Sequence, residues 1–432
     1  MTSLAPLEPR AFGTLVELIA TFDTTGDRAS DHLARAFRDP ALSDAERGRI
    51  ARCFYDSVRD RRRLALALGE SAAPRSIALA GELWRRALTL GEARRRDPLV
   101  DWARVEAIDG VIAAEADPLR RFAIAHALPD FLAERLLREH GDDAAPLARA
   151  LGDEPPQTLR ANPLLGSRDE VIEALRSEGV EVAPARHARL ALTVTNKTNV
   201  FKTEAFRRGR FEVQDEGSQL IAELVAPPPG GSIVDACAGA GGKTLALAAL
   251  SSGKGSIHAL DVSAEKLAEL RRRARRARAS NIRALAIDPS GPYPAPIEAL
   301  RGRIDRLLVD APCSGVGVLR RNPEARWRLT PEELARLPEL QRAILERALP
   351  LLSPGGRLIY ATCTVLDAEN EAVIRAVLAD HPELERVFIA EISGKAWSAP
   401  LARADGLAMV LSPHRHGTDG FFAAVLRRRR VP

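Results

Sequence analysis

Two of the four cysteines stand where a thiol could do chemistry. Cys313 follows the apolar segment IDRLLVD in the sequence DAPCSG, and Cys363 follows GRLIYAT in the sequence YATCT. Both apolar segments are typical of buried strands, so both thiols are expected at the carboxyl ends of strands in one sheet. A thiolate is a good nucleophile and can form covalent intermediates. The pair therefore indicates covalent catalysis, although position alone does not rank the two thiols.

A glycine-rich turn, DACAGAGGKT, follows the predicted strand SIVDAC and precedes the predicted helix TLALAAL. Glycine lets the backbone approach a ligand closely, and ligands of open α/β sheets bind beyond the carboxyl ends of the strands. A Walker loop does not fit, because Cys237 stands where its first glycine belongs. A dinucleotide fingerprint does not fit either, because Thr244 replaces its last glycine.

Aspartates end the predicted strands on either side of this turn. They are Asp235, Asp261, Asp288 and Asp310. Asp261, about twenty residues beyond the turn, is placed to accept hydrogen bonds from ribose hydroxyls. This row of acids on one rim, together with the turn, indicates a nucleoside-binding site.

The elements that carry these residues form three predicted regions. Residues 1–148 have apolar residues at helical spacing, with a capping box at Ser43 and Glu46, and predict an all-helical domain. Residues 149–210 begin at a Gly- and Pro-rich break and predict a small α/β connector. Residues 211–432 alternate short apolar strands with amphipathic helices, which predicts βαβ units and a largely parallel sheet.

The composition is that of a soluble globular protein, with 46% apolar and 28% charged residues. No apolar run approaches the roughly 18 residues needed to span a bilayer, and the N-terminus lacks the features of a secretory signal. The net charge of +5 suits a polyanionic partner without demanding one. Arginines cluster at residues 61–63, 94–96 and 271–276. Each cluster fits either a nucleic-acid contact or a solvated helix face.

The other two cysteines do not suggest a metal site. Cys53 lies on a predicted amphipathic helix and is expected in its core, and Cys237 belongs to the glycine-rich turn. None of the cysteines is paired as CxxC, so neither a zinc site nor a disulfide framework is predicted. We therefore expect a cytoplasmic protein without a metal, without a membrane partner, and monomeric.

Taken together, the motifs resemble the Fmu/Sun family of RNA cytosine-C5 methyltransferases. The resemblance covers about residues 150–432 and rests on DACAGAGGKT, DAPCSGVGVLRRNPEARW, YATCT followed by DAENE, and TDGFFAAVL, with FEVQDEGSQL resembling the family's lead-in. The helical first third is similar to the NusB-like RNA-binding domain of the bacterial ribosomal RNA member. The resemblance implies a Rossmann-like, S-adenosyl-L-methionine-dependent methyltransferase domain, preceded by a NusB-like helical domain and the connector.

The resemblance also implies a role for each motif. The turn that would bind the methionine part of S-adenosyl-L-methionine comprises Cys237, Ala238, Gly239, Ala240, Gly241, Gly242 and Lys243. Asp261 would hold the ribose, Asp288 would lie beside the adenine, and Asp310 would contact the cofactor or the cytosine ring. Cys363 would be the nucleophile, and Cys313 would assist product release. Gly239 and Ala240 depart from the usual CAAPGGK pattern, which bears on the rigidity of the turn and not on the chemistry.

The implied product is 5-methylcytosine. Carbon-5 of cytosine is too weak a nucleophile to attack a methyl sulfonium, but a thiolate that adds to carbon-6 pushes electron density onto carbon-5. A protonated Asp310 near ring N3 would stabilise the charge of the adduct. A base must then remove the carbon-5 proton, and the target nucleotide must be unstacked.

Several substrates and functions fit the motifs. Small-subunit (16S) ribosomal RNA is the expected substrate, with transfer RNA as the close alternative. A non-catalytic RNA-binding ribosome-assembly factor would not need the intact cysteine pair. A DNA cytosine methyltransferase would use the cysteine of a Pro-Cys motif and would not need the second thiol in YATCT.

Overall fold

The chain folds into two compact units in the computed structural model, which describes residues 5–196 and 198–430. Residues 1–4, at the start of the first predicted domain, and residues 431–432, at the end of the last, lie outside the described residues. The first unit comprises Met1–Asp153 together with Leu319–Leu329, and the second comprises Glu154–Val318 and Thr330–Pro432. The segment that follows the Cys313 loop is therefore part of the first unit, although the sequence on both sides of it belongs to the second.

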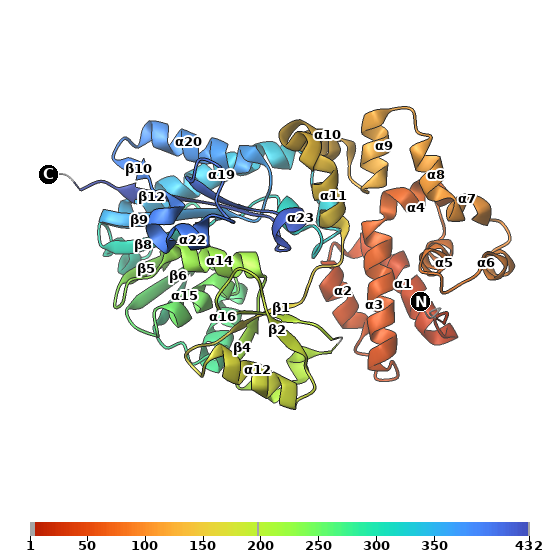
Figure 1. Cartoon of the computed structure of the whole chain (residues 1–432), viewed down its shortest axis with the longest axis horizontal. Helices are drawn as coiled ribbons and strands as arrows, with labels where there is room; N and C mark the ends of the chain where they lie inside the picture. The colour runs from red at the N-terminus through yellow and green to blue at the C-terminus, as the bar shows by residue number, and fades with distance from the viewer. Residues whose placement is uncertain (1–4, 197, 431–432) are drawn as a thin grey trace. The chain divides into compact units, whose positions relative to one another are not determined.

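The first unit is helical, in agreement with the prediction from apolar spacing (Figure 1). The predicted capping box at Ser43 is present, because its hydroxyl accepts a hydrogen bond from the backbone of Glu46 while the Glu46 carboxylate accepts from Ser43. The helices are α1 (Pro9–Thr25), α2 (Ala29–Ala36), α3 (Asp44–Arg59), α4 (Arg61–Leu68), α5 (Pro74–Trp84), α6 (Leu90–Arg96), α7 (Trp102–Glu106), α8 (Ile108–Ala113), α9 (Pro118–Ala125), α10 (Asp130–His140), α11 (Ala144–Gly152) and α18 (Ala325–Arg328).

Helix α18 is built into the core of the first unit through two side chains. Arg326 has no exposed surface and donates hydrogen bonds to the carbonyls of His126, Ala127 and Leu151. The indole of Trp327 donates to the carbonyl of Val58 over 2.6 Å. Because α18 follows the Cys313 loop directly in sequence, the helical unit supplies the packing for the chain that leaves this loop.

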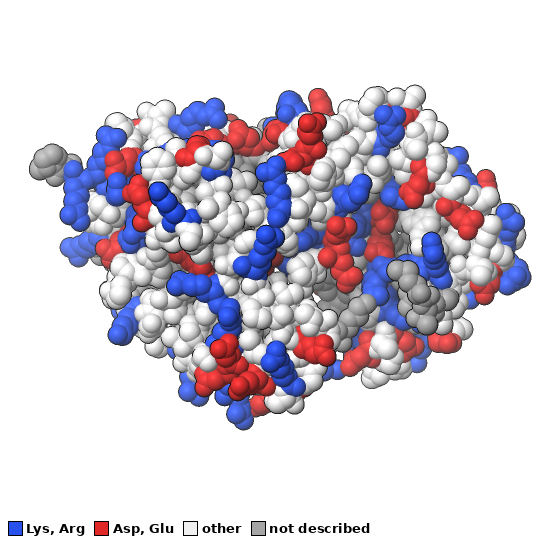
Figure 2. Space-filling view, viewed as in Figure 1, with Lys and Arg blue, Asp and Glu red and all other residues white. Residues whose placement is uncertain are grey.

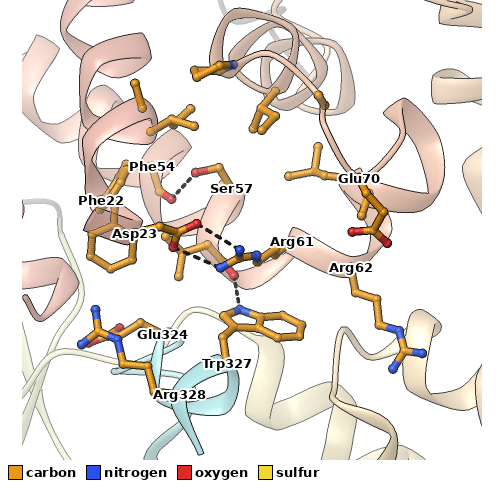
Figure 3. A pocket seen from close by; sticks show the side chains of 18 of the residues that line it. Phe22, Asp23, Phe54, Ser57, Arg61, Arg62, Glu70, Glu324, Trp327 and Arg328 are labelled. Carbon is orange, nitrogen blue, oxygen red and sulfur yellow. Dashed lines mark hydrogen bonds and ion pairs between the residues drawn. The ribbon is translucent and has the colours of Figure 1, made fainter. Parts of the chain in front are cut away.

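The arginine cluster at residues 61–63 is engaged in ion pairs within the first unit. Arg61, Arg62 and Arg63 pair with Asp23, Asp130 and Asp109 over 3.0, 2.6 and 2.6 Å. Figure 3 shows Arg61 in contact with Asp23 on the wall of a cavity of about 680 Å³, which Trp327 also lines. These pairs favour a structural role for the cluster over contact with nucleic acid.

A small antiparallel sheet opens the second unit. Its order within the described residues is β2-β3-β1-β4, and α12 (Arg168–Ser177) packs on it. Strands β1, β2 and β3 and helix α12 lie within the predicted α/β connector, whereas β4 lies beyond its predicted end at residue 210. The strands are β1 (Thr158–Ala161), β2 (Val182–Pro184), β3 (Ala191–Val194) and β4 (Phe211–Val213).

The large sheet of the second unit confirms the predicted Rossmann-like fold. Within the described residues its order is β10-β12-β9-β8-β5-β6-β7, with β11 paired to β12. Strands β5 to β9 are parallel, and β12 runs antiparallel to β9. The strands are β5 (Ser232–Asp235), β6 (Ser256–Asp261), β7 (Ile282–Ala286), β8 (Ile304–Asp310), β9 (Leu352–Thr362), β10 (Leu384–Arg386), β11 (Ala408–Leu411) and β12 (Phe421–Arg428).

Helices cover both faces of this sheet (Figure 1). Alternate strand residues enter two cores, so that Ile233 packs with one set of helices and Val234 with the other. None of the described helices is both long and apolar enough to cross a membrane. One core contains α14 (Glu216–Val225), α15 (Gly242–Leu250), α16 (Ala264–Arg276) and α21 (Ile389–Ser393), and the other contains α17 (Ala295–Glu298), α19 (Pro331–Ala348) and α20 (Glu371–Asp380).

The strand order reverses between β5 and β8. From β5 the chain moves outward through β6 and β7, and then returns to form β8 on the other side of β5. The carboxyl ends of β5 and β8 therefore border the crevice in which open α/β sheets bind their ligands. Asp235, Asp261 and Asp310 are the last residues of β5, β6 and β8, as expected. Asp288 lies two residues beyond β7, because the pairing of this edge strand ends at Ala286.

We predict that Arg326→Ala destabilises the first unit by about 2–4 kcal/mol, because three buried carbonyls would lose their donor. The exposed Arg336 on α19 offers a matched control, since Arg336→Ala removes the same charge without uncovering a buried acceptor. Thermal unfolding of the full chain followed by circular dichroism measures the effect. Equal melting midpoints for the two variants would contradict the structural role of Arg326.

Candidate active site

The structure brings the two predicted thiols together. Cys363 directly follows β9, Cys313 follows β8 after two residues, and these strands are adjacent and parallel. Their Sγ atoms lie 3.3 Å apart, and both side chains are partly buried. The arrangement places both sulfurs at the rim where the strand order reverses.

Lys243 brings a positive charge to this rim. Its Nζ lies 2.7 Å from Asp310 Oδ2, and 11% of its side chain is exposed. Burial opposes the charge of Lys243, but the ion pair with Asp310 outweighs burial and raises the pKa of the ammonium group, with a further contribution from Cys363. The ring of Phe421 lies 5.3 Å from Nζ and adds a cation–π contact. Lys243 therefore stays charged within the electrostatic reach of the Cys363 sulfur.

The surroundings of Cys313 favour its neutral form. Its hydrogen bond with Cys363 and its burial raise the pKa of the Cys313 thiol, and the carboxylate of Glu369 adds to the increase. Cys313 thus keeps its proton and can donate it toward the Cys363 sulfur. The two thiols, which position in the sequence could not rank, differ in their charged neighbours: Lys243 acts on Cys363, and Glu369 acts on Cys313.

Glu369 fixes the loop that carries Cys313. Its buried carboxylate accepts hydrogen bonds from the backbone of Ser314 over 2.8 Å and from the side chain of Gln341 over 3.0 Å. Its own carbonyl accepts the hydroxyl of Tyr360 over 2.6 Å. The sequence analysis named Glu369 only as part of the DAENE motif, and this motif was the signal that could have identified it.

Two glycines lock the backbone behind Cys363. Gly317 donates to the carbonyl of Cys363 over 3.0 Å, and Gly420 donates to the carbonyl of Gly317 over 2.8 Å. A Cβ atom on Gly317 would lie 2.2 Å from the Gly420 oxygen, so no other residue fits without movement of the backbone. This contact joins the GVG sequence after Cys313 to the TDGFF motif before β12.

The glycine-rich turn is held by Asp261. Gly239 donates to Asp261 Oδ2 and Ser263 donates to Oδ1, each over 2.8 Å. Gly239 has φ +54° and Gly241 has φ +87°, both in the left-handed region. A Cβ on Gly241 would lie 2.1 Å from the side chain of Leu270, so this glycine lets the turn pack closely on α16.

These residues fit the cofactor that the resemblance implies. The turn ends at the N-terminus of α15, whose first N–H groups have no partner within the helix and suit the carboxylate of a methionine. Asp261 has lone pairs left for ribose hydroxyls. Asp288 is exposed beyond β7, where its carboxylate accepts hydrogen bonds from Ser290. Cys237 and Ala238 lie at the base of the turn. Burial is the main cause that raises the pKa of the Cys237 thiol, and the negative charge of Asp235 is the second cause.

Three side chains that the sequence analysis did not assign to the site brace this turn. Arg160 donates to the carbonyl of Gly242 over 2.8 Å, and Arg273 donates to that of Ala240 over 2.7 Å. Glu212, with 3% of its side chain exposed, accepts hydrogen bonds from Arg273 over 2.9 Å and from Arg276 over 2.5 Å. Two members of the cluster at residues 271–276 therefore point inward and serve the turn. No local pattern connects β1, β4 and α16, so no signal in the sequence predicted this contact.

Asp235 carries a pH dependence between about pH 4 and 7. Burial raises its pKa to about 7, although Thr244 donates a hydrogen bond to Oδ2 over 2.7 Å. The folded protein therefore retains a proton that the unfolded chain releases near pH 3.8, the ordinary pKa of an aspartate.

We predict that stability falls as the pH rises from about 4 to 7, by up to about 1.4 kcal/mol per pH unit from this group. Asp235→Asn removes the titration and should flatten this part of the profile. Urea unfolding of both proteins over this pH range measures the slopes. If the two slopes agree, Asp235 does not hold the proton.

A second prediction concerns the brace. Glu212→Gln should weaken S-adenosyl-L-methionine binding about tenfold, because Arg273 would no longer be held against the turn. Glu269→Gln is the matched control, since Glu269 is half-exposed on α16 and pairs with its neighbour Arg272. Isothermal titration calorimetry compares the affinities, and thermal melting checks the fold. Equal affinity for both variants would show that the turn is rigid without the brace.

Comparisons with known proteins agree with this geometry. Residues 222–427 match the model of the family described as 16S rRNA methyltransferase RsmB/F, and residues 128–201 match the RsmF/B-like ferredoxin-like domain. The chain is 36% identical over 324 residues to a probable ribosomal RNA small subunit methyltransferase B of Bacillus subtilis, an alignment that covers 74% of this chain and 71% of the relative.

Solved structures resemble the chain as well. The crystal structure of PH0851 matches with a TM-score of 0.78 at 26% identity, over 98% of this chain and all of the other. A methyltransferase homolog protein from Pyrococcus horikoshii matches with a TM-score of 0.61 at 27% identity, over 72% of this chain and 99% of the other. The chain therefore belongs to the RsmB/F family of 16S rRNA methyltransferases, with S-adenosyl-L-methionine as its cofactor.

Proposed function

We propose that the protein methylates carbon-5 of a cytosine in 16S ribosomal RNA through a covalent adduct with Cys363. The observation that carries the proposal is the pair of thiols 3.3 Å apart at the reversal of strand order, beside the ion pair of Lys243 and Asp310. A binding protein without catalytic activity has no use for two adjacent thiols and a buried lysine. The ribosomal substrate is supported by the names of the relatives, and transfer RNA is the alternative.

Cys363 is the nucleophile in this proposal because of its charged neighbour. The ammonium group of Lys243 favours a negative charge on the nearby sulfur, and Cys313 can donate a hydrogen bond to that sulfur. The thiolate adds to carbon-6 of the cytosine, and carbon-5 becomes nucleophilic. S-adenosyl-L-methionine, when bound, supplies the electrophilic methyl group.

The Lys243–Asp310 pair serves the cytosine ring in this proposal. Addition at carbon-6 places negative charge toward ring N3, and a proton donor there stabilises the adduct. Asp310 needs a proton for this role, and Lys243 Nζ holds one 2.7 Å away from Asp310 Oδ2.

We assign product release to Cys313. Within the described residues it is the thiol that contacts the sulfur of the proposed adduct, and its raised pKa keeps it protonated at neutral pH. In the elimination, Cys313 would donate its proton to the Cys363 sulfur as the bond between that sulfur and carbon-6 breaks, and the Cys313 thiolate would then take up the carbon-5 proton.

Replacement of each cysteine tests the assignment. We predict that Cys363→Ala abolishes both methyl transfer and the covalent RNA complex, whereas Cys313→Ala still attacks and methylates but accumulates a protein–RNA adduct. Denaturing electrophoresis with labelled RNA and S-adenosyl-L-methionine detects the adduct, and bisulfite sequencing locates the modified cytosine. Cys53→Ala is the control, because Cys53 is buried in the helical unit.

Two outcomes would contradict the proposal. An adduct that accumulates in Cys363→Ala and disappears in Cys313→Ala would reverse the roles and point to the mechanism of DNA cytosine methyltransferases. Normal methylation by both variants would make the thiols structural.

We propose that the helical unit positions the RNA. Removal of this unit is a poor test, because a chain that starts near residue 150 leaves Arg326 and Trp327 without the partners described above. Substitutions in the full chain separate a loss of RNA positioning from a loss of packing.

A further inference from the structure

Three arginines lie in register across neighbouring strands of the large sheet. Arg306 on β8 is opposite Arg357 on β9, and Arg357 is opposite Arg427 on β12. Like charges directly opposite each other destabilise a strand pair. The next positions on the same face are apolar core residues, among them Leu308, Ile359 and Val425. Three like charges in a row at the end of an apolar face therefore require hydrogen-bond acceptors or negative charges close by.

Two of the three arginines have such a partner. Arg306 donates to the carbonyl of Val225 over 3.0 Å and to that of Ala226 over 3.2 Å, at the C-terminus of α14. Arg427 pairs with Glu385 over 2.7 Å.

The side chain of Arg357, the middle member, makes no hydrogen bond or ion pair within residues 5–196 and 198–430. Partial burial lowers the pKa of Arg357, and the charge of Arg427 lowers it further. The carboxylate of Glu391 offsets part of this effect without forming an ion pair with Arg357, so the guanidinium of Arg357 keeps its donors free for a ligand.

The side chain of Arg357 lines a cavity of about 630 Å³. Five arginines and two glutamates line it: Arg357, Arg427, Arg428, Arg429, Arg430, Glu385 and Glu391. Lys and Arg side chains gather at this edge of the molecule, beside the C-terminal end of β12 (Figure 2). We call this site the arginine cavity.

The arginine cavity lies at the rim opposite the two thiols. Arg357 precedes Cys363 by six residues along β9, which corresponds to about 20 Å of extended strand. A ligand in the cavity therefore does not reach the reacting base directly.

We propose that the arginine cavity binds phosphate groups of the RNA backbone at a distance from the target cytosine. The inference rests on the proposed function, which provides RNA as the substrate. A guanidinium group binds phosphate through two parallel hydrogen bonds, and arginine is the preferred residue for this contact. Four consecutive arginines at the end of β12 match a row of phosphates better than they match one free anion.

The test replaces the two arginines of the cavity that are free to bind. Arg357→Gln combined with Arg430→Gln should weaken binding of a synthetic single-stranded RNA roughly tenfold and reduce its salt dependence by about 0.7 in log–log slope for each lost phosphate contact. Arg357→Lys combined with Arg430→Lys should keep the salt dependence, because it keeps both charges, but should lose part of the affinity with the bidentate contacts. Arg283→Gln combined with Arg336→Gln removes the same charge from exposed positions on β7 and α19 and serves as control.

The folded state and the cofactor site are measured in parallel. The melting midpoint of the cavity variant should stay the same or rise, because one of three repelling charges is gone, and S-adenosyl-L-methionine affinity should not change. If the cavity and control variants bind RNA equally, the proposal is wrong.

Inorganic phosphate distinguishes the source of the anion. If phosphate raises the melting midpoint of the wild-type protein but not of the cavity variant, while both proteins bind RNA equally, the cavity is a site for free anions and not for the RNA backbone. If the wild-type protein binds S-adenosyl-L-methionine but no RNA, the proposed function is wrong, and RNA is not the ligand of the arginine cavity. Loss of RNA affinity in the cavity variant alone supports the inference.

Discussion

The ion pair between Lys243 and Asp310 is the interaction on which the site depends. It joins the first turn of α15 to the end of β8 across the crevice where the strand order reverses. Lys243 is mostly buried, so its charge requires a counterion close by, and Asp310 provides it. The same ammonium group lies within reach of Cys363. One pair of charges therefore holds the start of α15 against the end of β8 and determines the charge beside Cys363.

The loops around the thiols are held by buried polar groups from separate parts of the chain. Glu369 holds the Cys313 loop through Ser314, and Gly317 and Gly420 hold the backbone of Cys363. Each contact joins two of the motifs that the sequence analysis recognised as separate. The spacing of the sulfurs thus results from several satisfied hydrogen bonds, each of which would cost free energy if it were broken. A site built in this way is preorganised before RNA arrives.

The sequence predicted the elements of this fold well because their signals are local. Apolar strands, capping residues and glycine turns each depend on a few neighbouring residues, and the parallel sheet follows from their alternation. The contacts of Arg160, Glu212 and Arg273 with the turn depend on tertiary structure, since β1, β4 and α16 are far apart in sequence. The packing of Arg326 and Trp327 in the helical unit was equally invisible, because a charged side chain in a loop gives no indication of burial.

The departure from the CAAPGGK pattern now has a physical explanation. A proline at position 240 would fix its own φ and would restrict the preceding residue to extended conformations. Gly239 instead has φ +54°, which glycine adopts without strain. The two substitutions therefore belong together, since loss of the proline releases position 239 and glycine makes use of that freedom. Rigidity that a proline ring would supply within the turn comes here from outside it, through the guanidinium groups of Arg160 and Arg273 on the carbonyls of Gly242 and Ala240.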